Sequence, residues 1–370
     1  MTSILEQRQA LRRQCALIVP GFAAPDAATE FRQLADWCEA QGVAHDHYGK
    51  GELVEAFEGK LAALLGKPAA TFMPSGVMAQ LAAVRIWTEA ARLARFGMHP
   101  TSHLALHEEE AFSALLQCHG VPVGDRLRPM TAADLQAIAQ PLGCLIVELP
   151  IREAGGQLPS WDELEALKAA ARARGVALHM DGARLWESAA FYGRPPAEIA
   201  AGFDSVYVSL YKGIGAFAGA VLAGDAAFVA QARLWRRRMG GTLYHQSPMV
   251  ASAAMRFDER LAMMPALYQR TLAFAAALGQ RQALRVHPAV PQTNMLHLHV
   301  AAPAEIVLQA RDRVAETSGC WLFDNVRAAD VPGWSLTEIY VGDRLLQTDD
   351  LTVMPHFDRL CALLPGALAS

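Results

Sequence analysis

The sequence lacks a surplus of positive charge. Its 33 Lys and Arg residues are outnumbered by 37 Asp and Glu residues, and the formal net charge at pH 7 is −4. A protein that neutralises a run of phosphates needs the opposite balance, so we expect no nucleic-acid partner. The densest basic run, Arg236-Arg237-Arg238, is too short for a binding stripe and is typical of a solvated helix face.

Metal-site and disulfide patterns are absent as well. None of the six cysteines forms a C-x-x-C pair, and none has the spacing of a zinc site. Cys144 lies in an apolar run, where a reduced thiol behaves as a small hydrophobic side chain. The sequence therefore predicts a protein of a reducing compartment that binds no metal.

Long hydrophobic runs free of polar residues are also missing. The N-terminus is polar and charged, without the core of a signal peptide. Uncharged stretches such as 68–84 contain Pro, Gly, Ser and Gln, which predicts loops and core elements rather than membrane spans. We expect a cytoplasmic protein with no membrane partner.

The length and composition predict a globular protein of about two domains, because the chain has 370 residues and is 52% hydrophobic. Its middle alternates short apolar runs with helical patterns, which indicates a mostly parallel α/β sheet. We expect an N-terminal helical segment over 1–44, a large domain over 45–250 and a smaller α+β domain over 251–370.

Polar residues follow three of the expected strands at the point where each strand ends. Asp181 directly follows the apolar run 176–180, and Lys212 follows the run 205–210. Glu148 lies near the end of a third apolar run and marks the end of that strand less clearly. Ligands of open α/β sheets bind at the carboxyl ends of the strands. A buried lysine amine can form a Schiff base, and an aspartate can hold the protonated pyridine nitrogen that pyridoxal phosphate requires.

A third element suits the phosphate of that cofactor. Ser75-Gly76 lies between an expected strand at 69–73 and an expected helix at 77–93. A strand-to-helix turn of this kind offers backbone N–H groups, a hydroxyl and a helix dipole to an anion. Each signal alone is more often an ordinary turn or cap, and it is their common order along the chain that favours a cofactor site.

Several segments together resemble a known family. His179-Met180-Asp181-Gly182-Ala183-Arg184 resembles the H-x-D-G-A-R motif of the threonine aldolases, and 209–216 resembles their L-S-K-G-L-G-A segment. Over residues 45–300 the chain is therefore similar to these enzymes, within the β-eliminating lyase group of fold-type I pyridoxal-phosphate enzymes. Further matches in the same order are 46–49 to D-x-Y-G, 72–76 to F-x-P-[ST]-G, 240–241 to a Gly-Gly before a helix, and 293–295 to T-N-M.

The resemblance implies a fold and a cofactor. The fold is the α/β fold-type I architecture of the pyridoxal-phosphate-dependent transferases, with a large mostly parallel sheet domain and a smaller α+β C-terminal domain. The cofactor is pyridoxal 5′-phosphate. The resemblance implies that Lys212 forms the Schiff base, that Asp181 pairs with the pyridine nitrogen, and that Ser75 and Gly76 hold the phosphate.

The resemblance also assigns residues around the cofactor ring. It places Arg184 near the phenolic oxygen and the substrate carboxylate, and His107 against the ring, where it is our candidate for the catalytic base. The run 107–110 equally suits an acidic first helical turn, and both interpretations can hold together. Sites of this kind are shared between subunits of a homodimer or homotetramer, so Tyr48 or His245 should approach the partner's cofactor.

The sequence departs from the family's pattern at several positions. Tyr211 replaces the serine before the lysine, Val77 replaces a threonine of the phosphate turn, and His245 replaces an arginine. Glu338 aligns with the arginine that grips the substrate carboxylate. A carboxylate cannot fill that role, so either one of three arginines supplies the charge or Glu338 binds a cationic part of a different substrate. The three arginines are Arg152, Arg327 and Arg344.

The function that the resemblance implies is cleavage of the Cα–Cβ bond of a β-hydroxy L-amino acid to glycine and an aldehyde, with a natural substrate that need not be threonine. One alternative is another fold-type I reaction, a β-elimination or transamination of a β-substituted amino acid. Another is a non-catalytic, cofactor-binding regulatory protein. The candidate substrate-binding residues are Arg184, Tyr48, Arg152 and Glu338.

Overall fold

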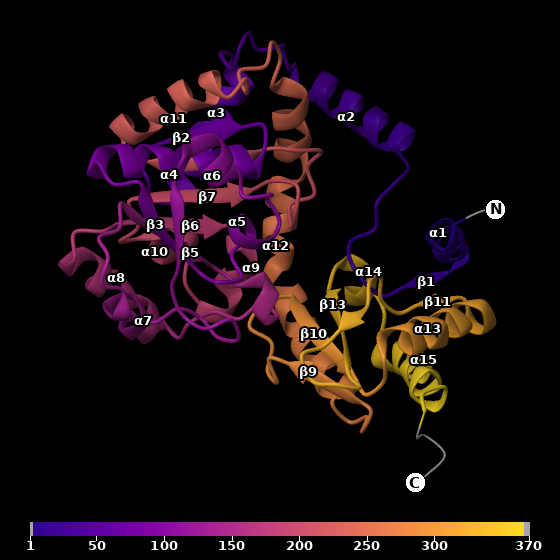
Figure 1. Cartoon of the computed structure of the whole chain (residues 1–370). Coiled ribbons are helices and arrows are strands. Elements are labelled where there is room, and N and C mark those ends of the chain that lie inside the picture. The colour runs from indigo at the N-terminus through magenta and orange to yellow at the C-terminus, as the bar shows by residue number, and fades with distance from the viewer. Residues whose placement is uncertain (1–2, 366–370) are drawn as a thin grey trace. The chain divides into compact units, whose positions relative to one another are not determined.

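The computed structural model describes residues 3–365, which divide into two compact units. The larger unit, residues 25–153 and 157–264, is built on a seven-stranded sheet in the order β2-β8-β7-β6-β5-β3-β4 (Figure 1). All neighbouring strands are parallel except those that pair with β8. The strands are β2 (Ala69–Met73), β3 (Arg95–Met98), β4 (His119–Pro122), β5 (Cys144–Glu148), β6 (Ala177–Gly182), β7 (Ser205–Ser209) and β8 (Ala220–Gly224).

Helices surround this sheet (Figure 1). Every residue of β5, β7 and β8 is buried, which is why these strands are continuous apolar runs rather than alternating ones. The helices are α2 (Ala27–Gln41), α3 (Glu52–Leu64), α4 (Gly76–Ala91), α5 (His103–Leu106), α6 (Ala111–Leu116), α7 (Ala132–Ala137), the 3-10 turn η1 (Arg152–Ala154), α8 (Trp161–Ala173), α9 (Leu185–Tyr192), α10 (Pro196–Ala200), α11 (Ala226–Arg238) and α12 (Ser247–Leu278).

The expected mostly parallel α/β sheet is confirmed. The strands anticipated near 69, 144, 176, 205 and 218 are β2, β5, β6, β7 and β8, and the helix anticipated after 76 is α4. The capping box that predicted α8 is also present, because the Ser160 Oγ accepts from the Glu163 amide and a Glu163 carboxylate oxygen accepts from the Ser160 amide.

The smaller unit, residues 1–24, 154–156 and 265–370, contains a four-stranded antiparallel sheet in the order β12-β13-β10-β9 and a parallel pair β1–β11. This agrees with the smaller α+β domain that we expected. Its elements are α1 (Ile4–Gln14), β1 (Leu17–Ile18), β9 (Leu284–His287), β10 (Met295–Val300), α13 (Ala304–Ser318), β11 (Cys320–Trp321), β12 (Arg327–Ala328), β13 (Ser335–Tyr340), α14 (Asp343–Leu346) and α15 (Asp350–Ala362).

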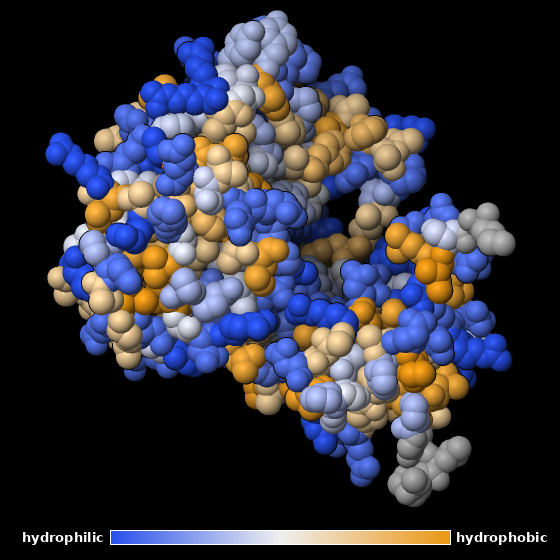
Figure 2. Space-filling view, viewed as in Figure 1, coloured by the Kyte–Doolittle hydropathy of each residue, from blue (hydrophilic) through white to orange (hydrophobic). Residues whose placement is uncertain are grey.

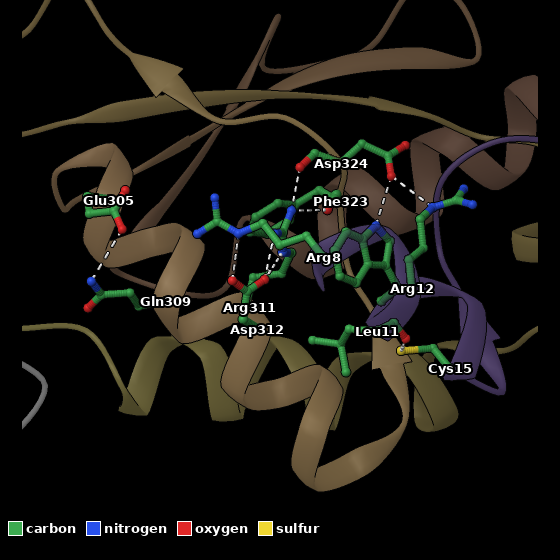
Figure 3. Close-up of polar contacts among 11 residues, drawn as sticks. Arg8, Leu11, Arg12, Cys15, Glu305, Gln309, Arg311, Asp312, Phe323 and Asp324 are labelled. Carbon is green, nitrogen blue, oxygen red and sulfur yellow. Dashed lines mark hydrogen bonds and ion pairs between the residues drawn. The ribbon is translucent and has the colours of Figure 1, made fainter. Parts of the chain in front are cut away.

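The N-terminal helix α1 belongs to the smaller unit through polar contacts with α13 and the loop after β11 (Figure 3). The Arg8 Nε lies 2.8 Å from the Asp312 Oδ2, and the Arg12 Nε lies 3.0 Å from the Asp324 Oδ1. Beside them the buried Arg311 guanidinium stacks over the Trp321 ring at 3.9 Å from its centroid.

The two units divide at residues 24/25 and 264/265. The boundaries that we expected from the sequence, at 44/45 and 250/251, both fall inside the larger unit. The second division falls within α12, next to Pro265, which removes one backbone hydrogen-bond donor from that helix.

Hydrophobic and hydrophilic residues are mixed over the face of the larger unit that Figure 2 presents. Across residues 3–365, no helix combines the length and the apolar character needed to cross a membrane.

Candidate active site

A cavity in the larger unit lies at the carboxyl ends of the central strands, where open α/β sheets bind their ligands. Asp181 reaches it from the end of β6 and Lys212 from the turn after β7. Both residues were candidates from the sequence, and in the structure both line this cavity. The residues that line the cavity include Gly76, His103, Glu148, Asp181, Arg184 and Lys212.

Lys212 is largely buried in the wall of this cavity. Burial lowers the pKa of its ammonium group, and the neighbouring Arg184 guanidinium lowers it further, whereas the carboxylates of Asp181, Glu148 and Glu187 raise it. The net shift is downward, so the amine is more readily available as a nucleophile than a surface lysine would be.

Asp181 is 2% exposed, and its Oδ1 accepts a hydrogen bond from the Ala183 amide at 3.1 Å. Burial raises the pKa of this carboxyl group, although Lys212, the Ala183 amide and Arg184 act in the opposite direction. A buried carboxylate whose pKa remains raised is stabilised by a cationic ligand. A protonated pyridine nitrogen is such a ligand, and the site residues therefore fit pyridoxal phosphate at this point.

Glu148 is a second buried carboxyl group in the same cavity, and the sequence alone did not assign it a role. Its Oε1 accepts from the Arg152 amide at 3.2 Å, and its Oε2 has no hydrogen-bond partner among the described residues. Burial, followed by the charge of Asp181, raises the pKa of Glu148 to about 8. Glu148 is therefore mainly protonated at neutral pH and can donate a hydrogen bond from the cavity wall.

The turn between β2 and α4 supplies the end of a helix to the cavity. Ser75 is the N-cap of α4, and its Oγ accepts from the Met78 amide at 3.2 Å, whereas Gly76 lines the cavity itself. A Cβ added to Gly76 would lie 2.2 Å from the Tyr207 Oη, so any larger residue requires the turn or the tyrosine to shift. The free backbone N–H groups of the first turn of α4 can bind an anion such as a phosphate.

The histidine that lines the cavity is His103, whereas we had expected His107. The His103 Nδ1 lies 2.6 Å from the Glu108 Oε1, and burial, followed by the charge of Lys212, lowers the His103 pKa to about 4. His107 lies next to it, with ring centroids 4.9 Å apart, but it is not among the residues that line the cavity, and its Nε2 lies 3.2 Å from the Glu153 Oε1. The two imidazoles are four residues apart, and the sequence offered no signal to choose between them.

A sequence model of the β-eliminating lyase family matches residues 31–301. The chain belongs to the β-eliminating lyase family. Among its relatives is the low-specificity L-threonine aldolase 1 of Arabidopsis thaliana, which is 27% identical over 296 residues, covering 77% of this chain and 82% of the relative.

Two solved structures are similar to this β-eliminating lyase over nearly its whole length. A protein described as a candidate L-allo-threonine aldolase from Listeria monocytogenes is 32% identical, with a TM-score of 0.92 over 98% of this chain and 100% of that one. A candidate aromatic amino acid β-eliminating lyase/threonine aldolase from Exiguobacterium is 36% identical, with a TM-score of 0.89 over 96% and 99%. The fold-type I architecture expected from the sequence is confirmed by these structures.

Tyr48 and His245, which we expected near a partner's cofactor, lie together outside this cavity. The Tyr48 amide donates to the Tyr244 carbonyl at 2.9 Å, and the His245 Nδ1 bonds to the Asp46 carbonyl. The buried Asp46 holds the two segments together, because its Oδ1 accepts from the backbone amide groups of residues 246 and 247, each at 2.7 Å. Tyr48 is 56% exposed and has a left-handed backbone conformation, with φ at 54°.

The candidate carboxylate-binding residues of this lyase lie in different units. Arg184 lines the cavity at the start of α9. The Arg152 backbone amide donates to the Glu148 Oε1. Glu338 lies on β13 of the smaller unit, opposite His297 of β10, and its Oε2 lies 4.0 Å from the His297 Nε2. Its alternatives Arg327 and Arg344, on β12 and α14, belong to the same unit.

Proposed function

We propose that this chain is a pyridoxal-phosphate-dependent carbon–carbon lyase that cleaves a β-hydroxy L-amino acid to glycine and an aldehyde. The observation that carries the proposal is the pairing of Lys212 with Asp181 in one buried cavity, where the lysine pKa is lowered. The names of the relatives and neighbours, which are threonine aldolases, support this reaction rather than another of the family.

The side chains around the cavity fit the cofactor group by group. Lys212 offers an amine to the aldehyde, Asp181 offers a carboxylate to the ring nitrogen, and the first turn of α4 offers backbone N–H groups to the phosphate. When bound, pyridoxal phosphate supplies an electron sink that stabilises negative charge at the substrate Cα. Val77 lines the same wall, so in this chain backbone groups rather than a threonine hydroxyl meet the phosphate.

Two side chains of the cavity can handle the substrate. The Arg184 guanidinium can bind the substrate carboxylate through charge-assisted hydrogen bonds. His103 is neutral at ordinary pH because its pKa is lowered to about 4. If its Nδ1–H donates to Glu108, its Nε2 is left as a proton acceptor, so we propose His103 in place of His107 as the base for the β-hydroxyl proton.

The remaining proposals concern assembly, location and substrate. We propose a homodimer or homotetramer, supported by the exposed aromatic pair Tyr48 and Tyr244, and a cytoplasmic location, supported by the six free cysteines. We also propose that the natural substrate is larger or more basic than threonine, because Glu338 aligns with the position of a carboxylate-binding arginine.

The experiment that tests the function uses the full-length protein loaded with pyridoxal phosphate. Borohydride reduction followed by peptide mapping should leave the cofactor on Lys212, and a panel of β-hydroxy amino acids should release aldehyde. The matched control is Lys60→Ala, which removes a surface lysine that pairs with Asp258. Attachment at another lysine would refute the site, and a loaded protein that converts no amino acid would favour a regulatory role.

A further inference from the structure

A chain of hydrogen bonds runs between α4 and one face of the sheet, from Trp87 to Asp181. The Trp87 Nε1 donates to the Ser205 Oγ at 2.8 Å, the Ser205 Oγ lies 2.8 Å from the His179 Nδ1, and the His179 Nε2 lies 2.8 Å from the Gln80 Oε1. The side chain of Gln80 is in turn hydrogen-bonded to the carboxyl group of Asp181.

Secondary structure places these side chains in line. His179 and Asp181 are two residues apart on β6 and so point to the same face of the sheet, and Ser205 of β7 is the cross-strand partner of His179. Gln80 and Trp87 are seven residues apart on α4, which puts them on one face of that helix. Gln80, His179, Asp181 and Ser205 are each no more than 4% exposed, so water does not compete with these bonds.

The chain of bonds has a direction, which the Gln80 amide sets. The Gln80 Oε1 faces the His179 Nε2 and can only accept, so the ring carries its proton on Nε2, and the Gln80 NH2 group is turned towards Asp181. The unprotonated His179 Nδ1 then accepts from the Ser205 hydroxyl, whose oxygen also accepts from the Trp87 indole N–H. Burial lowers the His179 pKa to about 3 and thereby keeps the imidazole neutral, as this arrangement requires.

The opposite direction would not suit an ionised Asp181. With the proton on Nδ1, the Gln80 amide would have to turn its nitrogen towards His179 and its oxygen towards Asp181. Two acceptors would then face each other unless Asp181 were protonated. The direction in which the hydrogen bonds donate therefore depends on the charge of Asp181, which must stay ionised beside the carboxyl group of Glu148.

We propose that Gln80, His179, Ser205 and Trp87 form a positioning relay that holds Asp181 ionised and oriented towards the ring nitrogen of the cofactor. The relay rests on the proposed cofactor, but it assigns a role to four residues that do not take part in the chemistry of the substrate. The other charged or titratable groups around Asp181 are Lys212 and Arg184, which favour its ionised form, and Glu148 and Tyr207.

The first experiment compares two ligands on the full-length protein freed of cofactor. One is pyridoxal phosphate, and the other is its analogue with a C–H group in place of the ring nitrogen, which has no proton for Asp181 to bind. Ser205→Ala interrupts the relay, and Thr88→Val removes a buried hydroxyl of the same helix α4 that bonds only to Val84, Arg85 and Cys118.

We expect Ser205→Ala to weaken the binding of pyridoxal phosphate by about five- to ten-fold, which corresponds to one buried hydrogen bond. The binding of the analogue should be nearly unchanged. Thr88→Val should weaken neither ligand selectively. Trp87→Phe is a milder second variant, because its ring can keep the stacking on Phe228, at 5.2 Å between centroids, and lose only the N–H. Equal weakening of both ligands, or of neither, would overturn the relay.

A second experiment needs no cofactor. In the nitrogen NMR spectrum of histidine-labelled protein, His179 should be a neutral ring with its proton on Nε2, and its signal is assigned by its loss in His179→Asn. A proton on Nδ1, or a charged ring, would overturn the relay. If the wild type binds neither ligand, the proposed cofactor and the relay fall together. If it binds pyridoxal phosphate selectively but releases no aldehyde from any amino acid, only the proposed reaction fails.

Discussion

Glu148 lies directly opposite Asp181 on the neighbouring parallel strands β5 and β6, and both carboxyl groups are buried in the wall that holds Lys212. Two carboxyl groups at this spacing do not both ionise readily, because burial raises both pKa values and the charge of Asp181 raises that of Glu148 further. At Asp181 this rise is opposed by the charge of Lys212, the Ala183 amide, the charge of Arg184 and the Gln80 side chain, in that order. Glu148 is therefore the member of the pair that keeps its proton.

The first prediction concerns the stability of the protein without cofactor. The Glu148 pKa is about 8 in the folded chain and is near its ordinary value of 4.5 when unfolded, so between these pH values the folded state binds more protons. The free energy of unfolding of the wild type should therefore fall as the pH rises from 5 to 8. In Glu148→Gln this fall should be smaller by at least ~1.4 kcal/mol, the equivalent of one pH unit.

Urea unfolding of both proteins at the two pH values measures that difference. Glu165→Gln is a suitable control, because Glu165 pairs with Lys168 at 2.8 Å and is half exposed. Parallel pH profiles for the wild type and Glu148→Gln would show that Glu148 is ionised in the folded protein.

The second prediction separates the two histidines. His103→Asn should lower kcat/KM for the best β-hydroxy substrate by about 100-fold or more, the usual contribution of a general base. His107→Asn should change it much less, because His107 does not line the cavity and its Nε2 faces Glu153. Steady-state aldehyde release measures both variants. A larger loss in His107→Asn would restore the assignment made from the sequence.

The lowered pKa of His103 also predicts how the activity depends on pH. Its pKa is lowered to about 4, so the ring is neutral and able to accept a proton throughout the neutral range. Loss of activity through protonation of His103 should therefore begin only below about pH 5. A wild-type activity that already falls between pH 7 and 6, and does so through a group absent in His103→Asn, would contradict the assignment.

The third prediction tests the phosphate turn. In Gly76→Ala the new Cβ would meet the Tyr207 Oη at 2.2 Å, so the turn or the tyrosine must shift. We expect a loss of about 1–3 kcal/mol in stability, typical of overpacking, together with weaker binding of pyridoxal phosphate. Gly59→Ala is the matched control, since Gly59 lies within α3 and nothing approaches its added Cβ within 4 Å.

Thermal unfolding and cofactor titration of both variants decide the matter. Gly59→Ala should be neutral or stabilising, because alanine favours a helix interior by up to ~1 kcal/mol over glycine. Equal behaviour of the two variants would mean that the tyrosine moves aside without cost and that Gly76 is not required for space.

The fourth prediction concerns the substrate carboxylate. An Arg–carboxylate pair is charge-assisted and about twice as strong as a neutral hydrogen bond. The presence of Glu338 in place of an arginine should therefore weaken the binding of a small substrate such as threonine, for which Arg184 would be the remaining carboxylate anchor. We expect poor cleavage of threonine by the wild type, better cleavage of a larger or basic β-hydroxy amino acid, and improved threonine turnover in Glu338→Arg. The measurement is kcat/KM for both substrates, with Glu338→Ala as the control. Ordinary threonine cleavage that Glu338→Ala leaves unchanged would point to Arg152 or Arg344 as the anchor.

Local patterns were sufficient for much of the fold. The strands β5, β6 and β7 were recognisable because each is a short apolar run that stops abruptly at a polar residue, and α8 was recognisable from its capping box. Short strands with little apolar character were not recognised. β3 begins with an exposed arginine and β4 ends in a proline, so neither has the continuous apolar run that marked the other strands.

The chemistry divides in the same way. Asp181 and Lys212 could be picked from the chain because each follows its own strand, and the carboxyl ends of parallel strands meet at one edge of a sheet. Contacts between side chains of distant segments could not be predicted from the sequence. They depend on the order of strands in the sheet and on the face of the sheet that each side chain occupies. The tertiary structure alone places Glu148 against Asp181, His103 rather than His107 in the cavity, and Gln80 between His179 and Asp181. It also places α1 with the smaller unit, through ion pairs such as Arg8–Asp312 that join residues 304 positions apart. The physical reason is that hydrogen bonds and burial act over a few ångströms in space, whatever the distance along the chain.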